Sequence, residues 1–137
     1  MRIELNLPYP PSANSIWRVG RGGAVYKTRK YTEFKREVSR ILNATGQKLA
    51  GDAYQATIIF FPCDRRRRDA DNPVKALFDA ITQSGAVWND DRQVVSFSVT
   101  MGAPAETPFT HIVIETLETS YNLSPTHFGG EDKKHKK

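Results

Sequence analysis

The sequence has little cysteine and no long apolar run, and each absence excludes a class of protein. Cys63 is the only cysteine in 137 residues, so an internal disulfide or a cysteine-rich zinc cage is excluded. The longest apolar stretch, residues 58–61, is far shorter than the ~18 residues that a membrane span needs. The first residues also lack the apolar run of a signal peptide. We therefore expect a soluble cytoplasmic protein without a membrane partner.

A chain of this length forms one compact domain, and its apolar content of 39% is enough for a single core. The hydrophobic pattern is lost near residue 120, after which the sequence has no period and ends in charge. We predict one domain over residues 1–119 and a loose charged tail over residues 120–137.

The periodicity of the apolar residues predicts an α+β fold. Residues with β-strand character occupy 2–7, 53–61, 95–101 and 109–117. Apolar stripes at helical spacing predict helices over residues 29–44 and 73–84, which end at Gly46 and Gly85. The element order is therefore β-α-β-α-β-β. We expect a small mixed sheet of about four strands with both helices on one face, an irregular loop over residues 12–23, and a hairpin between the last two strands.

Basic residues exceed acidic ones by 20 to 15, and the excess is unevenly placed. The first 50 residues are strongly basic, and Arg65 to Arg68 form one run. Such a surface suits a polyanion, because neutralised phosphates release counterions. The charge alone is equally compatible with a protein that has no particular ligand.

Five aspartates gather in two short segments that flank the second predicted helix: Asp64, Asp69, Asp71, Asp90 and Asp91. The segment after the helix is long enough for the two groups to meet, although the geometry does not demand it. Carboxylates repel one another unless a cation lies between them, and Mg²⁺ prefers oxygen ligands. With Lys75 in the first helical turn, these residue types suit metal-dependent phosphodiester hydrolysis.

Each of these residues also has a simpler interpretation. Asp71 or Asn72 before Pro73 is typical of a helix N-cap, and the aspartates after the helix are typical of a turn. Lys75 and Asp79 have the spacing of a surface ion pair. Taken together, these interpretations leave the crowding of acids and arginines between residues 64 and 91 unexplained.

Several motifs resemble the RusA family of Holliday junction resolvases, in order and near the family's spacing over about residues 1–117. They are Pro10-Pro-Ser-Ala-Asn14, Asp64-Arg-Arg-Arg-Arg-Asp-Ala-Asp-Asn72, Lys75, Phe78-Asp-Ala80 and Trp88-Asn-Asp-Asp91. The arginine-rich segment is the most specific of these, and the Pro-Pro-Ser element alone is weak. One extra residue before Trp88 leaves two registers for Asp90 and Asp91.

The resemblance implies a phage- or prophage-associated endonuclease that resolves four-way DNA junctions by paired nicks in recombination and repair. It implies a homodimer that depends on Mg²⁺, with Mn²⁺ as a substitute, and that needs no small-molecule cofactor. The metal-binding catalytic acids are then Asp69, Asp71 and Asp91, and Lys75 assists at the scissile phosphate. Asp90 and Asn14 are accessory residues.

The expected contacts to the DNA backbone come from basic residues of two segments. They are Arg65, Arg66, Arg67 and Arg68, together with Lys30, Lys35 and Arg36 of the first helix. The two-fold symmetry of a junction is matched by a two-fold dimer. Trp88 and Phe97 are candidates for the dimer interface, although such residues more often belong to the core.

Other classes of function explain less of the sequence. A non-catalytic junction- or DNA-binding protein accounts for the basic charge but not for the acids. A phosphatase with an Asp-x-Asp motif needs its first aspartate directly at a strand end, and Asp69 comes too late after Phe61. A histidine or cysteine hydrolase is disfavoured because Cys63 has no evident partner and the histidines lie in a strand or in the tail.

Overall fold

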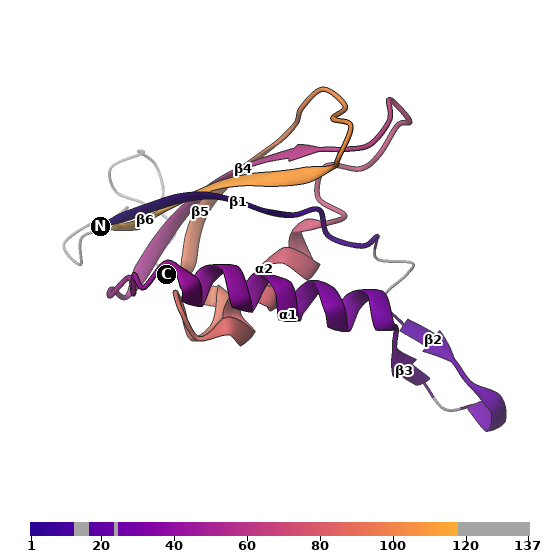
Figure 1. Cartoon of the computed structure of the whole chain (residues 1–137). Coiled ribbons are helices and arrows are strands. Elements are labelled where there is room, and N and C mark those ends of the chain that lie inside the picture. The colour runs from indigo at the N-terminus through magenta and orange to yellow at the C-terminus, as the bar shows by residue number, and fades with distance from the viewer. Residues whose placement is uncertain (13–16, 24, 118–137) are drawn as a thin grey trace, which may run out of the picture.

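The computed structural model describes residues 1–12, 17–23 and 25–117, which form an α+β fold around one four-stranded mixed sheet (Figure 1). The sheet contains β1 (Arg2–Pro8), β4 (Ala53–Phe61), β5 (Val94–Met101) and β6 (Phe109–Leu117). The helices α1 (Arg29–Ala44) and α2 (Val74–Ser84) lie side by side against one face of this sheet. The predicted fold class is confirmed, and these six elements lie within one residue of their predicted bounds.

The strand order is β1-β6-β4-β5, which corrects the predicted hairpin between the last two strands. β4 pairs parallel to β5 and antiparallel to β6, so it lies between them. Parallel neighbours need a crossover, and here α2 supplies it between β4 and β5. β6 then takes the position between β1 and β4, where Ile112 and Ile114 are fully buried.

The core lies between the sheet and the two helices. α1 buries Tyr31, Phe34, Val38 and Leu42 along one stripe, as its helical spacing predicts. β4 contributes every second residue, from Tyr54 to Phe60, because side chains alternate between the two faces of a strand. Trp88 is 1% exposed and belongs to this core, so its candidacy for a dimer interface was wrong. Phe97 is 51% exposed and stays a candidate.

The segment predicted as an irregular loop over residues 12–23 contains regular structure. β2 (Trp17–Val19) and β3 (Val25–Lys27) form a separate two-stranded antiparallel sheet that projects from the start of α1 (Figure 1). The turn between them passes through Gly22 and Gly23 at positive φ, a region where glycine carries no steric cost. Strands of three residues are too short to show alternation in a sequence.

Two predictions fall on residues outside the described ranges, namely the tail over residues 120–137 and the accessory residue Asn14. Over the ranges that are described, none of the helices is both long enough and apolar enough to cross a membrane.

Candidate active site

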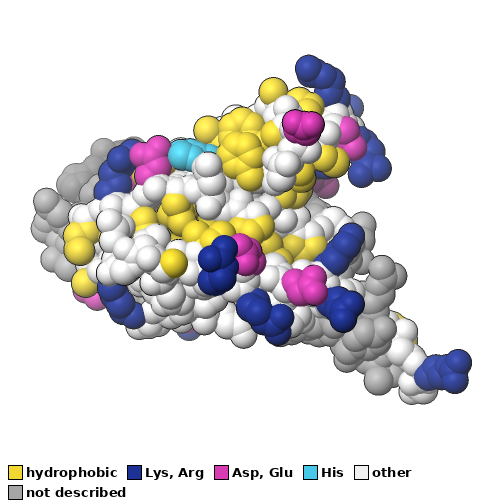
Figure 2. Space-filling model, viewed as in Figure 1, with side chains coloured by type: hydrophobic (Ala, Val, Ile, Leu, Met, Phe, Trp, Pro, Cys, Tyr) yellow, Lys and Arg dark blue, Asp and Glu magenta, His cyan; other side chains and the backbone are white. Residues whose placement is uncertain are grey.

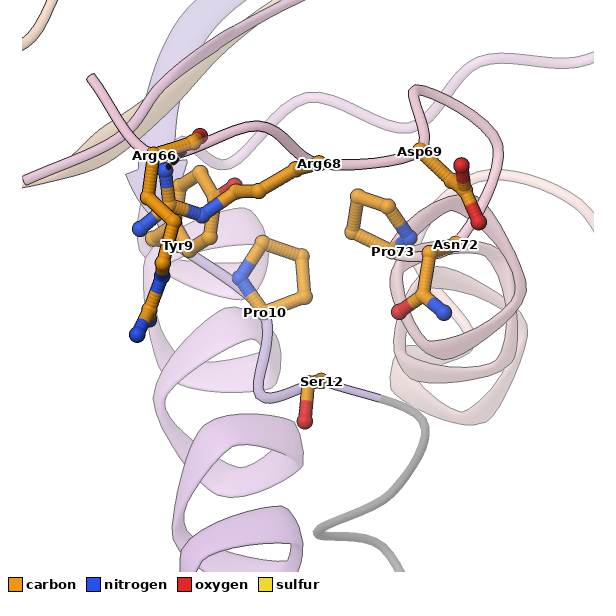
Figure 3. Close-up of a pocket in the computed structure, with 8 residues that line it drawn as sticks. All are labelled: Tyr9, Pro10, Ser12, Arg66, Arg68, Asp69, Asn72 and Pro73. Carbon is orange, nitrogen blue, oxygen red and sulfur yellow. Dashed lines mark hydrogen bonds between the residues drawn. The ribbon is translucent and has the colours of Figure 1, made fainter. Parts of the chain in front are cut away.

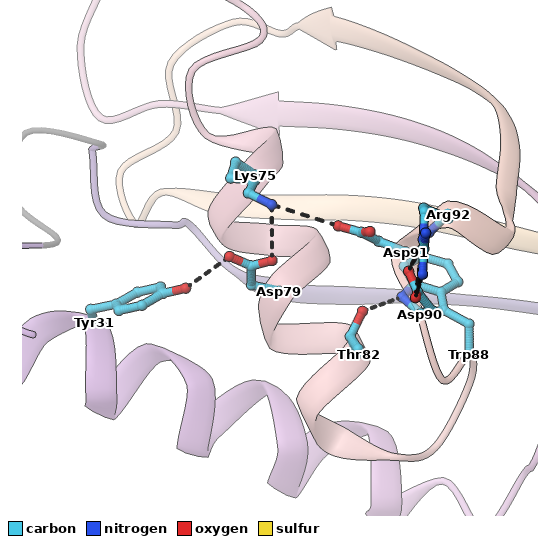
Figure 4. A network of polar contacts seen from close by, with 8 residues as sticks. All are labelled: Tyr31, Lys75, Asp79, Thr82, Trp88, Asp90, Asp91 and Arg92. Atoms are coloured by element: carbon cyan, nitrogen blue, oxygen red, sulfur yellow. Dashed lines mark hydrogen bonds and ion pairs between the residues drawn. The ribbon is translucent and has the colours of Figure 1, made fainter.

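The segment after α2 returns along the helix and brings Asp91 to the first helical turn (Figure 4). Gly85 ends α2 in the left-handed conformation, with φ at 71°, and so lets the chain reverse. The carboxylate of Asp91 then lies 3.9 Å from the ammonium of Lys75, which is the second residue of the helix. The return that the sequence permits is therefore present in the fold.

Aromatic packing and hydrogen bonds fix this return segment. The indole of Trp88 donates a 2.7 Å hydrogen bond to the hydroxyl of Thr82 on α2. Its ring contacts Phe78 and Tyr54, with ring centroids 5.4 and 5.8 Å away. The hydroxyl of Tyr54 also donates to the carbonyl of Val87 at 3.2 Å. Because buried aromatic rings and buried hydrogen bonds oppose movement, Asp91 has a rigid support.

Asp90 and Asp91 have different roles in the structure. Asp90 is the N-cap of the short 3-10 helix η3 (Asp91–Gln93) and accepts hydrogen bonds from both the backbone and the guanidinium of Arg92. The hydrogen bonds from Arg92 lower the pKa of Asp90 to about 2. Gln93 completes a capping box by accepting from the backbone N–H of Asp90 at 3.2 Å. Asp90 is thus committed to the turn, whereas Asp91 faces Lys75.

Lys75 belongs to a chain of contacts that reaches α1 (Figure 4). Its ammonium lies 3.5 Å from one oxygen of Asp79, and the other oxygen accepts a 3.3 Å hydrogen bond from the hydroxyl of Tyr31. Burial and the neighbouring Asp79 carboxylate raise the pKa of Tyr31 to about 12, so its hydroxyl stays a donor. The simple prediction of a Lys75–Asp79 ion pair is confirmed. The contribution of Tyr31 was not predicted, because it comes from a different helix.

Asp69 and Asp71 lie in the turns that lead into α2, and both side chains are exposed. Their backbone carbonyls accept from Asn72 at 3.3 Å and from Val74 at 3.2 Å, which fixes the chain direction. The N-cap of α2 is Pro73, without a side-chain hydrogen bond, so the N-cap interpretation of Asp71 or Asn72 was wrong. In the part of the chain that the structure describes, no side chain is hydrogen-bonded to either of these two carboxylates.

The donor set suits a hard divalent ion, but the structure does not gather it into one cluster. Among the described residues, no group of three His, Cys, Asp or Glu side chains is placed to hold a metal ion. Asp69 and Asp71 precede α2, and Asp91 is held beside Lys75. Carboxylate oxygens are the ligands that Mg²⁺ prefers, and all three acids lie around the N-terminal end of α2. The residues therefore fit the ion in chemistry, whereas their assembly is incomplete.

The four arginines before Asp69 divide into two kinds. Arg68 is only 19% exposed in its side chain, and its guanidinium pairs with Asp64 at 2.8 Å. The Arg68 guanidinium also donates to the carbonyl of Arg66 at 2.8 Å, so both of these contacts lie within the loop of residues 64–68. Arg65, Arg66 and Arg67 are exposed. We conclude that three side chains face outward and that the fourth shapes the loop.

The basic residues of α1 line a broad groove beside α2. Lys35 and Arg36 lie on one side of this groove, and Gln83 of α2 lies on the other. Lys30 is exposed one turn earlier on the same helix. Figure 2 shows Lys and Arg side chains spaced along the face of the molecule that α1 forms. The predicted basic face of the helix is therefore present, next to the end of α2.

Comparison with known proteins gives one consistent result. A family model described as Endodeoxyribonuclease RusA matches residues 8–115. The crossover junction endodeoxyribonuclease of Enterobacteria phage 82 is 39% identical over 99 residues, which cover 70% of this chain and 79% of the phage protein. The RusA protein of Escherichia coli K12, which has the same activity in its name, is 38% identical over 97 residues with the same coverage. The corresponding protein of phage HK97 is 32% identical over 114 residues, covering 82% of this chain and 93% of its own.

Proposed function

This chain belongs to the RusA family of endodeoxyribonucleases, and from that premise we propose that it is a crossover junction endodeoxyribonuclease that resolves four-way DNA junctions. The observation that carries the proposal is the position of Asp91 beside Lys75. This contact lies at the N-terminal end of α2, which directly follows Asp69 and Asp71 in the sequence. A helix that begins next to two acids and receives a third across its first turn concentrates the residues that phosphodiester hydrolysis needs.

In the proposed mechanism, Asp69, Asp71 and Asp91 hold a divalent ion, Mg²⁺ with Mn²⁺ as a substitute. When bound, such an ion activates water and stabilises the negative charge that develops at phosphorus. The chain's own cation is Lys75, whose ammonium contacts the scissile phosphate. Removal of one preorganised donor of this kind costs about 10²–10³ in rate.

Asp79 and Tyr31 position Lys75 in this mechanism. The Lys75 side chain is 75% exposed, and an exposed lysine samples many rotamers unless a partner restrains it. Asp79 restrains the ammonium together with Asp91, and the hydroxyl of Tyr31 restrains Asp79. The lysine is therefore held between two carboxylates before the substrate arrives.

The outward arginines and α1 bind the DNA backbone. Arg65, Arg66 and Arg67 precede the acids, while Lys30, Lys35 and Arg36 lie on the helix that Tyr31 connects to Asp79. Contacts to phosphates position the duplex arms without reading the bases. Arg68 supports this surface by holding the loop rather than by contacting DNA.

Two copies of the chain match the two-fold symmetry of a junction and make the paired nicks. Val95 and Phe97 are 57% and 51% exposed on β5, an edge strand of the sheet. Phe97 packs on Phe78 of α2, with ring centroids 5.3 Å apart. An exposed apolar edge of this kind suits a contact between copies. The same family premise supports a role in DNA recombination and repair, a prophage origin and a cytoplasmic location.

A second candidate function is junction binding without cleavage. The observation that favours it is the lack, within the described ranges, of a three-residue group that is placed to hold a metal ion. The basic surface alone then accounts for DNA binding.

Strand cleavage of a synthetic four-way junction separates the two candidates. The wild type and Asp71→Asn are incubated with the junction and with linear duplex, in Mg²⁺ and in EDTA. We expect paired Mg²⁺-dependent nicks in the junction alone, which the variant loses while it still binds. Binding without cleavage in any divalent ion would overturn the enzyme and leave the second candidate.

A further inference from the structure

A cavity of about 220 Å³ lies directly beside Asp69, and no step of the proposed mechanism uses it (Figure 3). Its walls include the rings of Tyr9, Pro10 and Pro73. Arg66 and Asp69 lie on opposite sides of it. The cavity thus combines apolar walls with polar groups at its rim, and one of these groups is a proposed metal ligand.

The walls that Tyr9, Pro10 and Pro73 form are fixed before any ligand arrives. Tyr9 follows β1, and its ring meets that of Phe60 edge to face, with centroids 5.7 Å apart. Pro10 and Pro73 are buried, and a proline ring has no rotamers to lose. Burial also raises the pKa of the Tyr9 hydroxyl, so it stays a hydrogen-bond donor. Preformed walls of this kind lower the ordering cost of binding.

The size and chemistry of the cavity select its occupant. Pockets for drug-sized ligands measure ~300–1,000 Å³, so a cavity of about 220 Å³ suits one planar ring system. The lining also includes Ser12, Arg68 and Asn72, and the guanidinium of Arg68 is already paired with Asp64. The apolar rings and the carboxylate of Asp69 therefore favour a flat, partly apolar group over a phosphate. A nucleobase is such a group, because every base has a flat face that stacks on an aromatic ring and an edge that forms hydrogen bonds.

We propose that this cavity receives an unstacked nucleobase of the cleaved strand, next to the scissile phosphate. The inference rests on the proposed function, because Asp69 is one of the acids assigned to that phosphate. Tyr9 supplies the stacking surface, and Arg66 at the rim contacts the neighbouring backbone.

The cavity also accounts for a preference for junctions over duplex. Extrusion of a base has a free-energy cost that is largest for a well-stacked, paired base, and bases at a branch point have fewer neighbours on which to stack than bases inside a duplex. A junction delivers a base to the cavity at lower cost, so the cleaved strand reaches the acids more readily. The proline-rich segment Pro8 to Pro11 then has a function, since it supplies Tyr9 and Pro10 to the cavity.

Junctions with 2-aminopurine at successive positions around the branch point test the proposal. They are bound in EDTA by Asp71→Asn, which retains the cavity, and by the double variant Tyr9→Leu with Asp71→Asn. We expect a fluorescence change at a position next to the cleavage site, which the double variant loses. A change that survives in the double variant, or no change at any position, would overturn the cavity assignment.

Cleavage rates provide the second readout. Tyr9→Leu, which keeps an apolar contact to Phe60, is expected to lower the junction cleavage rate roughly 5- to 100-fold, whereas Tyr9→Phe stays near the wild type. Phe109→Leu is the matched control, because Phe109 stacks on Phe61 and has no contact with the cavity. If Tyr9→Leu and Phe109→Leu cleave junctions at equal rates while the wild type cleaves normally, the assignment of the cavity to a nucleobase is refuted and the proposed function is not. A wild type that neither binds nor cleaves junctions would refute the proposed function and the inference with it.

Discussion

The two segments that flank α2 have similar aspartates but opposite surroundings. Residues 85–93 are packed and hydrogen-bonded, with Trp88 in the core and Asp90 in a capping box. Residues 62–73 are mostly exposed, and the ion pair between Arg68 and Asp64 links two parts of this segment. Residues 85–93 present one acid, Asp91, at a fixed place. Residues 62–73 present Asp69, Asp71 and three arginines to solvent.

This difference indicates how the work of the site is divided. A catalytic group gains most from a fixed position, because misplacement of about 1 Å can cost 10²-fold in rate. A surface that accepts a branched DNA gains from side chains that can adapt. We therefore propose that residues 85–93 hold Asp91 at a fixed position beside Lys75, and that the outward arginines of residues 62–73 contact the substrate next to Asp69 and Asp71. The following variants test that division.

The largest expected effect is a difference in cleavage rate between variants of Asp91 and of Asp90. Asp91→Asn should lower the junction cleavage rate by about a thousandfold, because several kcal/mol of ion-dependent stabilisation is lost. Asp90→Asn should lower it less than about fivefold, since an exposed ion pair with Arg92 contributes little. Single-turnover cleavage of both variants measures the contrast, and equal losses would show that the division between the two acids is wrong.

The next effect concerns the support of Lys75. Lys75→Met should lower kcat about a hundredfold, and Asp79→Asn about tenfold with KM unchanged, because the ammonium loses its restraint. Tyr31→Phe should act in the same direction as Asp79→Asn and more weakly. A rise in KM at constant kcat for Asp79→Asn would assign this residue to substrate binding instead.

A smaller effect distinguishes the arginines. Arg67→Ala should reduce the salt dependence of junction binding by roughly one unit of slope, because one phosphate contact is lost. Arg68→Ala should instead speed hydrogen exchange at the Arg66 amide, which donates to Asp64 inside the loop. If Arg68→Ala changes the salt slope and leaves that exchange rate unaltered, its structural role is refuted.

The smallest effect is the pH dependence of stability at Asp90. Its pKa falls from an ordinary value of 3.8 to about 2 on folding, so the ionised form stabilises the native state. The contribution is fully present above pH 3.8 and is lost as the pH falls through about 2. Urea unfolding of the wild type and Asp90→Asn should show a stability gap at neutral pH that closes in acid. A gap that is constant with pH would contradict this account.

Much of the fold could be predicted because it depends on local patterns. The stripe from Tyr31 to Leu42 defines α1, and alternation defines β4 and β6. The sheet order could not be predicted in this way, because alternation shows which face a residue takes and not which strand lies beside it. The β2–β3 pair was not predicted, because strands of three residues are too short to show a period in the sequence.

The site follows the same rule. The contact of Lys75 with Asp79 is one helical turn and was predicted, whereas Tyr31 reaches Asp79 across 48 residues of sequence. The capping box between Asp90 and Gln93 is visible in the sequence and would have distinguished Asp90 from Asp91. The pairing of Arg68 with Asp64 was not predicted, because the i,i+4 spacing indicates a contact only within a helix and these residues lie in a loop.

The central claim is that acids from both segments share one divalent ion, and a double-mutant cycle of ion binding tests it most directly. Mn²⁺ is titrated calorimetrically into the wild type, Asp71→Asn, Asp91→Asn and the double variant. Residues that share one ion are not additive, so each single variant should lose most of the affinity and the double variant little more. Additive losses, or wild-type affinity in Asp91→Asn, would contradict the shared site.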